Sequence, residues 1–115
     1  MAIGYKRLKR TGNNLWYSCV QHAEKGGRTY RVGVSTTPRP AHGPLCVFRT
    51  RRQAKLFDCG SHIARCRYRK SYRKGIWFLL WGKGAKREPW WELPAGTVFA
   101  ESVTLLEEPR DADTP

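Results

Sequence analysis

The chain has 115 residues, of which 40% are hydrophobic and 12% aromatic, and its formal net charge is +13. This length suits one domain with one core, and the apolar content is too high for a disordered chain. No apolar run approaches the roughly 18 residues that a membrane-spanning helix needs, and the first residues contain no apolar stretch of signal-peptide length. We therefore expect one cytoplasmic domain with no membrane partner.

The charge is distributed unevenly along the chain. Residues 1–87 carry 21 Lys and Arg against Glu24 and Asp58, whereas residues 88–115 carry Arg110 against seven carboxylates. Because a strongly basic body raises the local concentration of polyanions, we expect nucleic acid or another polyanion as the partner. The alternatives are an acidic host protein and a role of the charge in solubility alone.

Short β-type runs bounded by turn residues predominate, which predicts a mainly antiparallel sheet. In chain order these runs are Leu15–Val20, Thr29–Val34, Leu45–Phe48, His62–Tyr68, Ile76–Trp81 and, with an interruption, Thr97–Leu106. A helix over residues 98–108 is the alternative for the last run, but its β-branched residues favour a strand. Residues 1–106 are predicted to form a single basic domain, and residues 107–115 an acidic, flexible tail.

One short helix is predicted at about residues 51–58. Thr50 and Gln53 have the spacing of a capping box, and Gly60 is expected to end the helix. The predicted fold class is therefore α+β, a small twisted antiparallel sheet with this helix packed on it. Arg51 and Arg52 occupy the first turn, where free N–H groups favour anions. With Arg49 they are predicted to form a phosphate pocket, unless their side chains simply extend into water.

A second group of cations lies in the run before residue 75. Period-2 alternation places Arg65, Arg67 and Arg69 on one strand face and Ala64, Cys66 and Tyr68 on the other. The following residues add cations and an interleaved aromatic ring, namely Lys70, Tyr72, Arg73 and Lys74. This pattern predicts a surface that binds nucleic-acid phosphates, although a merely solvated sheet face has the same pattern.

Tryptophans and cysteines allow further interpretations. Trp77, Trp81 and Trp90 are candidates for base stacking if they are exposed, and core residues if they are buried. A zinc site could be assembled from Cys19, His22, Cys59, His62 and Cys66. However, Cys46 and Cys66 fall in predicted strands, where free cysteine acts as a small buried hydrophobe. We therefore expect no metal or other cofactor, and no disulfide.

Several segments together resemble small uncharacterised proteins encoded by bacteriophages and prophages. The segments are Gly4-Tyr5-Lys6, Tyr30-Arg31-Val32-Gly33, Gly43–Phe48 leading into Ala54 and Phe57, Leu93–Thr97 and Val103–Leu106. The resemblance implies a short accessory protein that acts on host nucleic acid or on a host defence system, and it brings no catalytic motif.

The residues themselves give little support for catalysis. The basic body has only Glu24 and Asp58 as carboxylates, too few for a two-metal nuclease, and no nucleophile motif surrounds a cysteine or histidine. The leading hypothesis is thus a non-enzymatic protein that binds nucleic-acid phosphates through the arginine strand face and the helix start. The alternatives are a phage accessory protein that inhibits a host protein by direct contact, and a small nucleotide-directed enzyme.

Overall fold

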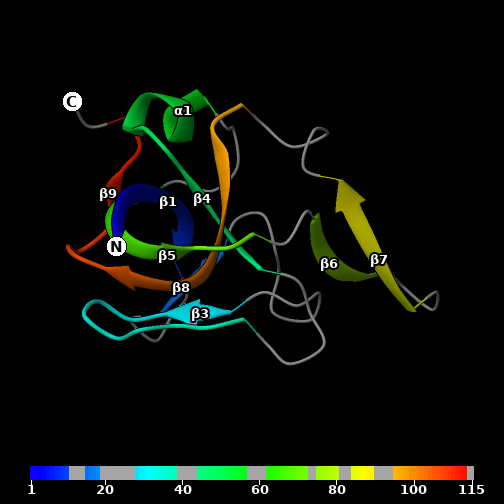
Figure 1. The fold of residues 1–115 in the computed structure, drawn as a ribbon. Helices are drawn as coiled ribbons and strands as arrows, with labels where there is room; N and C mark the ends of the chain where they lie inside the picture. Colours follow the sequence, from blue (N-terminus) through cyan, green and yellow to red (C-terminus); the bar gives the residue numbers. More distant parts are fainter. Residues whose placement is uncertain are drawn as a thin grey trace.

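A computed structural model describes residues 1–10, 15–18, 28–38, 44–56, 62–72, 75–80, 84–89 and 95–113, with backbone alone for 75–80 and 84–89. These residues form nine strands and one helix (Figure 1). In chain order they are β1 (Ala2–Arg10), β2 (Trp16–Ser18), β3 (Thr29–Tyr30), β4 (Leu45–Phe48), α1 (Arg51–Leu56), β5 (His62–Lys70), β6 (Gly75–Leu80), β7 (Gly84–Pro89), β8 (Thr97–Leu105) and β9 (Arg110–Asp111).

Four antiparallel strands close into a small barrel. β1 pairs with β5 from Ala2 opposite Tyr68 to Leu8 opposite His62, β5 pairs with β8, and β8 pairs with β4. β4 returns to β1 through the single pair Tyr5 and Phe48, which closes the circle. β2 and β3 extend the sheet beyond β1, β9 pairs with one end of β5, and β6 and β7 form a separate two-stranded sheet.

The predicted α+β fold class is therefore wrong, because the molecule is a β-barrel with one short helix. A short helix packed on the sheet is predicted, and α1 does pack on the barrel through Ala54, but it has only six residues and lies outside the barrel at the end where β9 is found (Figure 1). The described residues contain no helix long and apolar enough to cross a membrane.

The predicted strands are all present, and three further strands are not predicted. β4 has the expected bounds, and β8 is a strand rather than the alternative helix. The register between β5 and β8 shifts at Arg69 and Lys70, so that Glu101 is passed over and β8 bends from β4 toward β5. The unpredicted strands are β1, β7 and the two-residue β9. In β1, inward-facing Lys6 interrupts the apolar alternation by which strands are recognised.

The barrel interior is filled by the inward faces of its four strands. Leu8 belongs to this core, and its other buried members are Trp16, Tyr30, Leu45, Val47, Ala64, Cys66, Tyr68, Val98, Ala100, Val103 and Leu105. β5 shows the expected alternation, because Ala64, Cys66 and Tyr68 are buried whereas the residues between them are exposed.

Lys6 is buried inside this core. Its side chain is 1% exposed, its Nζ donates to the Cys46 carbonyl at 2.5 Å, and Nζ lies 5.1 Å from the centroid of the Tyr30 ring. The hydrogen bond crosses the seam between β1 and β4, where only one residue pair is in register. Burial lowers the pKa of Lys6 below its ordinary value of 10.5, although the nearby Cys46 and Cys66 thiols act in the opposite direction.

Arg7 joins the barrel to the helix. The residue is 6% exposed, and its Nη1 donates to the Ala54 carbonyl at 3.0 Å and to the Lys55 carbonyl at 3.3 Å. Carbonyls at a helix C-terminus lack partners within the helix and attract cations. Arg7 therefore stabilises the end of α1. On the buried side of this helix, Ala54 packs against Phe48, Ile63 and Ala112.

The C-terminal segment is part of the folded domain through Asp113. β9 pairs with β5 at His62 and Ile63, and Ala112 is 6% exposed beside α1. Residues 107–113, which belong to the predicted tail, thus include a strand and a buried residue that pack on the barrel.

Gly4 provides a test of the barrel seam. A Cβ at this position would lie 2.9 Å from the Phe48 carbonyl oxygen and 2.9 Å from Tyr68 Cε1. We expect Gly4→Ala to lower the free energy of unfolding by about 1–3 kcal/mol, as overpacking does in cores. Ile3→Ala, on the neighbouring half-exposed residue, should have a smaller effect. Urea denaturation measures both, and an unchanged midpoint for Gly4→Ala would contradict the close approach.

Lys6 should make the stability depend on pH. Between its lowered folded pKa and its ordinary value of 10.5, the unfolded chain binds a proton that the folded protein lacks. Stability therefore rises with pH in this range, by at most about 1.4 kcal/mol per pH unit. The neutral amine can still donate to the Cys46 carbonyl.

The measurement is urea unfolding of the natural protein and of Lys6→Met at about pH 6 and about pH 8.5. The free energy of unfolding of the natural protein minus that of the variant should increase with pH. The range from about pH 6 to about pH 8.5 lies below 9.0, the ordinary pKa of the buried Cys46 and Cys66 thiols. Subtracting the value of the variant from that of the natural protein cancels the contributions of other groups. A difference that stays constant or decreases with pH would contradict a depressed Lys6 pKa.

Candidate functional site: an arginine stripe and its end pocket

The outer face of β5 carries a row of exposed cations. Arg65, Arg67 and Arg69 are exposed, and Lys70 follows them at the end of the strand. Side chains on one face of a strand are about 7 Å apart, a distance similar to that between successive phosphates of an extended nucleic-acid strand. We call the three arginines and Lys70 the arginine stripe.

The strands beside β5 determine what lies next to each member of the stripe. Tyr5 of β1 is opposite Arg65, and Ile3 of β1 is opposite Arg67. On the β8 side, Thr104 is opposite Arg67 and Ser102 is opposite Arg69. No carboxylate is therefore directly opposite these arginines in the described register, and their charge faces solvent.

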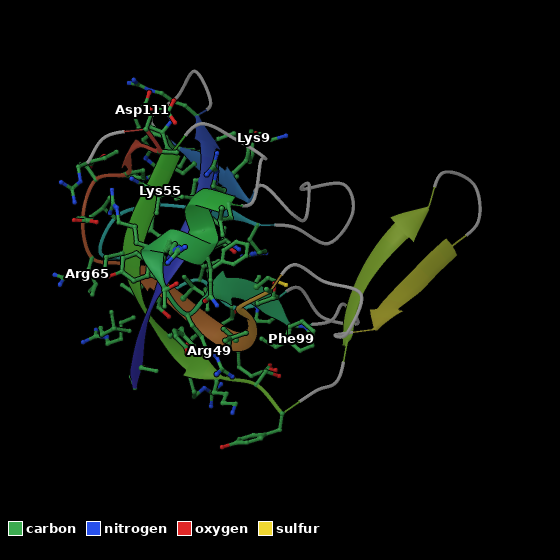
Figure 2. All side chains as sticks on the ribbon, turned by 90° about the horizontal axis from the view of Figure 1, so that it is seen from above. Lys9, Arg49, Lys55, Arg65, Phe99 and Asp111 are labelled. Atoms are coloured by element: carbon green, nitrogen blue, oxygen red, sulfur yellow. The ribbon has the colours of Figure 1, made fainter. Side chains whose placement is uncertain are left out.

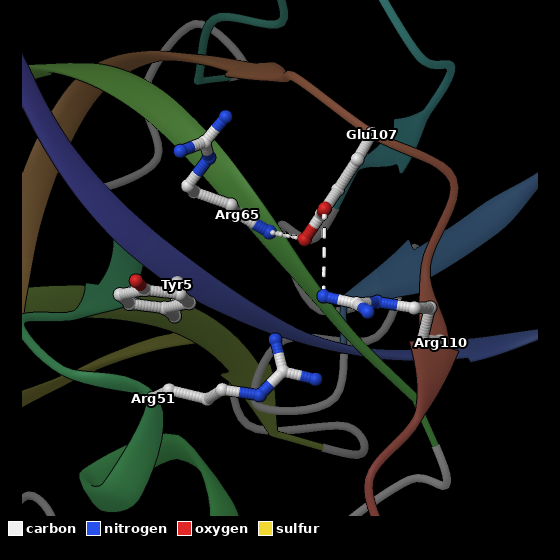
Figure 3. A pocket seen from close by; sticks show the side chains of 5 residues that line it. All are labelled: Tyr5, Arg51, Arg65, Glu107 and Arg110. Carbon is white, nitrogen blue, oxygen red and sulfur yellow. Dashed lines mark hydrogen bonds and ion pairs between the residues drawn. The ribbon is translucent and has the colours of Figure 1, made fainter. Parts of the chain in front are cut away.

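The stripe meets a pocket at Arg65. Five side chains from five places in the chain line a cavity of about 440 Å³, which is within the size range of ligand pockets (Figure 3). The lining residues are Tyr5 of β1, Arg51 of α1, Arg65 of β5, Glu107 after β8, and Arg110 of β9. Tyr5 is held in place because it packs against the cluster of buried residues beneath α1.

The pocket is strongly positive. Glu107 is its one carboxylate among the described lining residues, and Glu107 Oε2 lies 3.7 Å from Arg110 Nη2. Its Oε1 accepts a hydrogen bond of 3.0 Å from the backbone N–H of Arg65. Among the described lining residues, three arginines and one carboxylate give an excess of two positive charges, and such a group of arginines is suited to binding an anion.

Arg51 has an unused hydrogen-bond donor at this pocket. Its Nη2 atom is buried and has no hydrogen-bond partner among the described residues, and its guanidinium extends into the same space as that of Arg110 (Figure 3). A buried donor without a partner is unfavourable, and because this atom has almost no accessible surface, a ligand in the cavity would have to bind the other nitrogens of the guanidinium or shift the side chain.

The predicted pocket at the helix start has a different composition from the observed one. Arg51 lines the cavity and extends toward Arg110 (Figure 3), whereas Arg52 is exposed and does not line the cavity. Arg49 is also exposed and lies apart from Arg65 in the view from above (Figure 2). The backbone N–H of Gln53 donates to Thr50 Oγ1 at 3.1 Å, as the capping box predicts. This N–H is therefore not available to an anion. Side chains, rather than the helix start, form the pocket.

The other end of the stripe carries an exposed aromatic ring. Tyr72 is 85% exposed, and Lys70 Nζ lies 5.7 Å from the centroid of its ring. Met1, Arg69 and Glu101 line an open hollow with these two residues, and Glu101 accepts a hydrogen bond from the Ser71 hydroxyl. Tyr72 can therefore offer one face to a planar group that lies beside the stripe.

Several predicted site residues fall outside the described part of the chain. These are Arg73, Lys74, Trp81 and Trp90, together with the side chain of Trp77, whose backbone lies in β6. Cys19, His22 and Cys59 of the zinc alternative are also outside it. The roles of these residues in phosphate binding, base stacking or zinc binding stay predictions.

The described members of the cysteine and histidine group lie in the barrel. Cys66 and Cys46 are buried free thiols, and burial raises the pKa of Cys46 to about 11 and that of Cys66 to about 12. His62 packs its ring against Trp16, with centroids 4.9 Å apart. The two cysteines are thus protonated core residues at neutral pH, as their position in predicted strands indicated.

Tyr5, Glu107 and Arg110 are pocket residues that the sequence patterns do not indicate. Tyr5 lies in an unpredicted strand, and the other two lie in the segment predicted to be a flexible tail. The available signal is Arg110 itself, which is the one cation among the seven carboxylates after residue 87. A lone cation in an acidic segment is a reason to look for a local partner, and here that partner is Glu107.

A comparison of the chain with protein-family models, with curated proteins and with solved structures finds no match. The resemblance to small phage proteins therefore stays a prediction, and the interpretation of the site depends on its own geometry.

Glu107 allows a test of the pocket by a gain of binding. Glu107→Gln removes the negative charge, while an amide oxygen can still accept from the Arg65 N–H. We expect inorganic phosphate to bind this variant several-fold more tightly than the natural protein, because one competing anion is lost. Titration of phosphate at constant ionic strength, followed by two-dimensional NMR, measures the affinity.

Glu108→Gln is the matched control, since Glu108 is adjacent and exposed and does not line the pocket. It changes the net charge by the same amount. An equal gain in both variants would mean that phosphate responds to overall charge rather than to the pocket.

Proposed function

We propose that this protein binds single-stranded nucleic acid, without catalysis, by placing successive phosphates along the arginine stripe of β5. The observation that carries the proposal is the exposed row of Arg65, Arg67 and Arg69, with no carboxylate opposite them in the described register. Arginine guanidinium groups form paired, charge-assisted hydrogen bonds with phosphate oxygens. A row on one strand fits one phosphate backbone.

Aromatic rings near the stripe favour a single strand over a duplex. Tyr72 is exposed beside Lys70, and half-buried Tyr5 lies beside Arg65. Unpaired bases can stack on such rings, and each stacked base contributes about 1–3 kcal/mol in single-strand binding. The paired bases of a duplex cannot reach the rings in this way.

A binding role also agrees with the chemical groups near the stripe. Glu107 is already held by Arg110 and by the Arg65 N–H, and the Cys46 and Cys66 thiols are buried with raised pKa values. The described surface around the stripe thus offers hydrogen-bond donors and aromatic rings for a ligand. Affinity is expected to depend on phosphates more than on base sequence.

The test is the salt dependence of binding to a short single-stranded oligonucleotide. Arg67→Gln combined with Arg69→Gln should weaken binding at least tenfold and should lower the slope of log affinity against log salt by about 0.7 for each lost phosphate contact. Fluorescence anisotropy at several salt concentrations measures both quantities. A duplex of the same sequence should bind more weakly than the single strand.

Arg31→Gln combined with Lys55→Gln is the control, because both residues are exposed and lie outside the stripe and the pocket. This variant also loses two charges. If both double variants weakened binding equally, binding would be due to a diffuse basic surface and not to the arginine stripe. Salt-resistant capture of one acidic protein, with no oligonucleotide binding, would instead support the host-inhibitor alternative.

A further inference from the structure

The arginine stripe is blocked at the end where the pocket lies. The next outward residue of β5 beyond Arg65 is Ile63, which is 0% exposed. It packs against Ala54 of α1 and against Ala112 after β9. A nucleic-acid strand that follows the stripe from Arg69 to Arg65 therefore cannot continue along β5, and must end or turn at the pocket.

The pocket offers more positive charge than any single position along the stripe. Along the stripe, one arginine is available for each phosphate, whereas Arg51, Arg65 and Arg110 converge on one cavity. An internal phosphodiester carries one negative charge. A terminal phosphomonoester carries about −1.5 to −2 at neutral pH and has three acceptor oxygens. The two uncompensated positive charges of the pocket thus match a terminal phosphate better than an internal one.

The arginines that line the pocket also favour a ligand with several acceptor atoms. In Figure 3 the Arg51 and Arg110 side chains extend into the cavity from different elements, with Glu107 and Arg65 on its far side. A phosphate with three free oxygens can accept from more than one guanidinium group at once. An internal phosphate has only two free oxygens, and its chain would have to turn away from β5, because Ile63 is covered by α1.

We propose that this pocket recognises the terminal phosphate of a nucleic-acid strand whose following phosphates lie on Arg67 and Arg69. The proposal rests on the proposed function, because the stripe supplies the binding of the rest of the strand. It adds a specificity for strand ends that the stripe alone does not have.

The experiment compares short single strands of one sequence that carry a fluorescent label on an internal base and a phosphate at the 5′ end, at the 3′ end, or at neither. We expect the phosphate at one of the two ends to tighten binding by about tenfold, as a charge-assisted hydrogen-bond network does. This gain should vanish in Arg51→Gln combined with Arg110→Gln. It should persist, at lower overall affinity, in Arg67→Gln combined with Arg69→Gln.

Folding of each variant is checked by thermal unfolding, and Arg51→Lys serves as a second pocket variant that keeps the charge but loses the planar fork of the guanidinium. It should lose most of the gain. Equal affinity for all three strands, or a gain that survives in the pocket variants, would overturn the terminal-phosphate site while leaving the stripe intact. Binding of a mononucleotide as tight as that of the phosphorylated strand would also overturn it. Failure of every strand to bind would refute the stripe itself.

Discussion

The pairing of β1 with β5 in one register is the constraint on which the rest of the structure depends. This register places Lys6 and Leu8 inside the barrel, whereas Tyr5 and Arg7 lie on the outer side. A shift by one residue would exchange the two faces, because side chains alternate along a strand. It would expose Leu8, remove Arg7 from the helix carbonyls, and turn Tyr5 away from the pocket. The core, the helix and the site therefore share one determinant.

Two cations of the basic body are structural rather than available to a ligand. Lys6 donates to a carbonyl across the weakest seam of the barrel, and Arg7 donates to the last carbonyls of α1. In these hydrogen bonds both side chains use backbone oxygens as acceptors. Removing a charged group from water is unfavourable unless it is well hydrogen-bonded. A sum over charges in the sequence therefore overstates the charge that a ligand can reach.

Local patterns predict the strands of this protein better than they predict its architecture. The alternation in β5 and the β-branched residues of β8 are local signals, and both strands are observed. β1 was missed because the charge of Lys6 occupies an inward position. Barrel closure was missed because it requires β1 to pair with β5 across about half of the chain, and no short pattern reports such a contact. The same reason explains the pocket, in which Tyr5 and Arg110 come from opposite ends of the chain.

β5 combines stability and the proposed binding role without placing them in conflict. Its inward residues Ala64 and Cys66 contribute to the core, while the arginines that alternate with them face outward. The binding face can therefore change with little effect on packing.

Glu107 determines how positive the end pocket is. By holding Arg110 and the Arg65 N–H, it keeps two of the walls in position before any ligand arrives. It also lowers the pocket's excess charge from three to two. A pocket with an excess of two is nearly neutralised by a phosphomonoester but only half neutralised by a phosphodiester. The carboxylate therefore weakens anion binding in general, and what it contributes is the fixed position of Arg110 and of the Arg65 backbone.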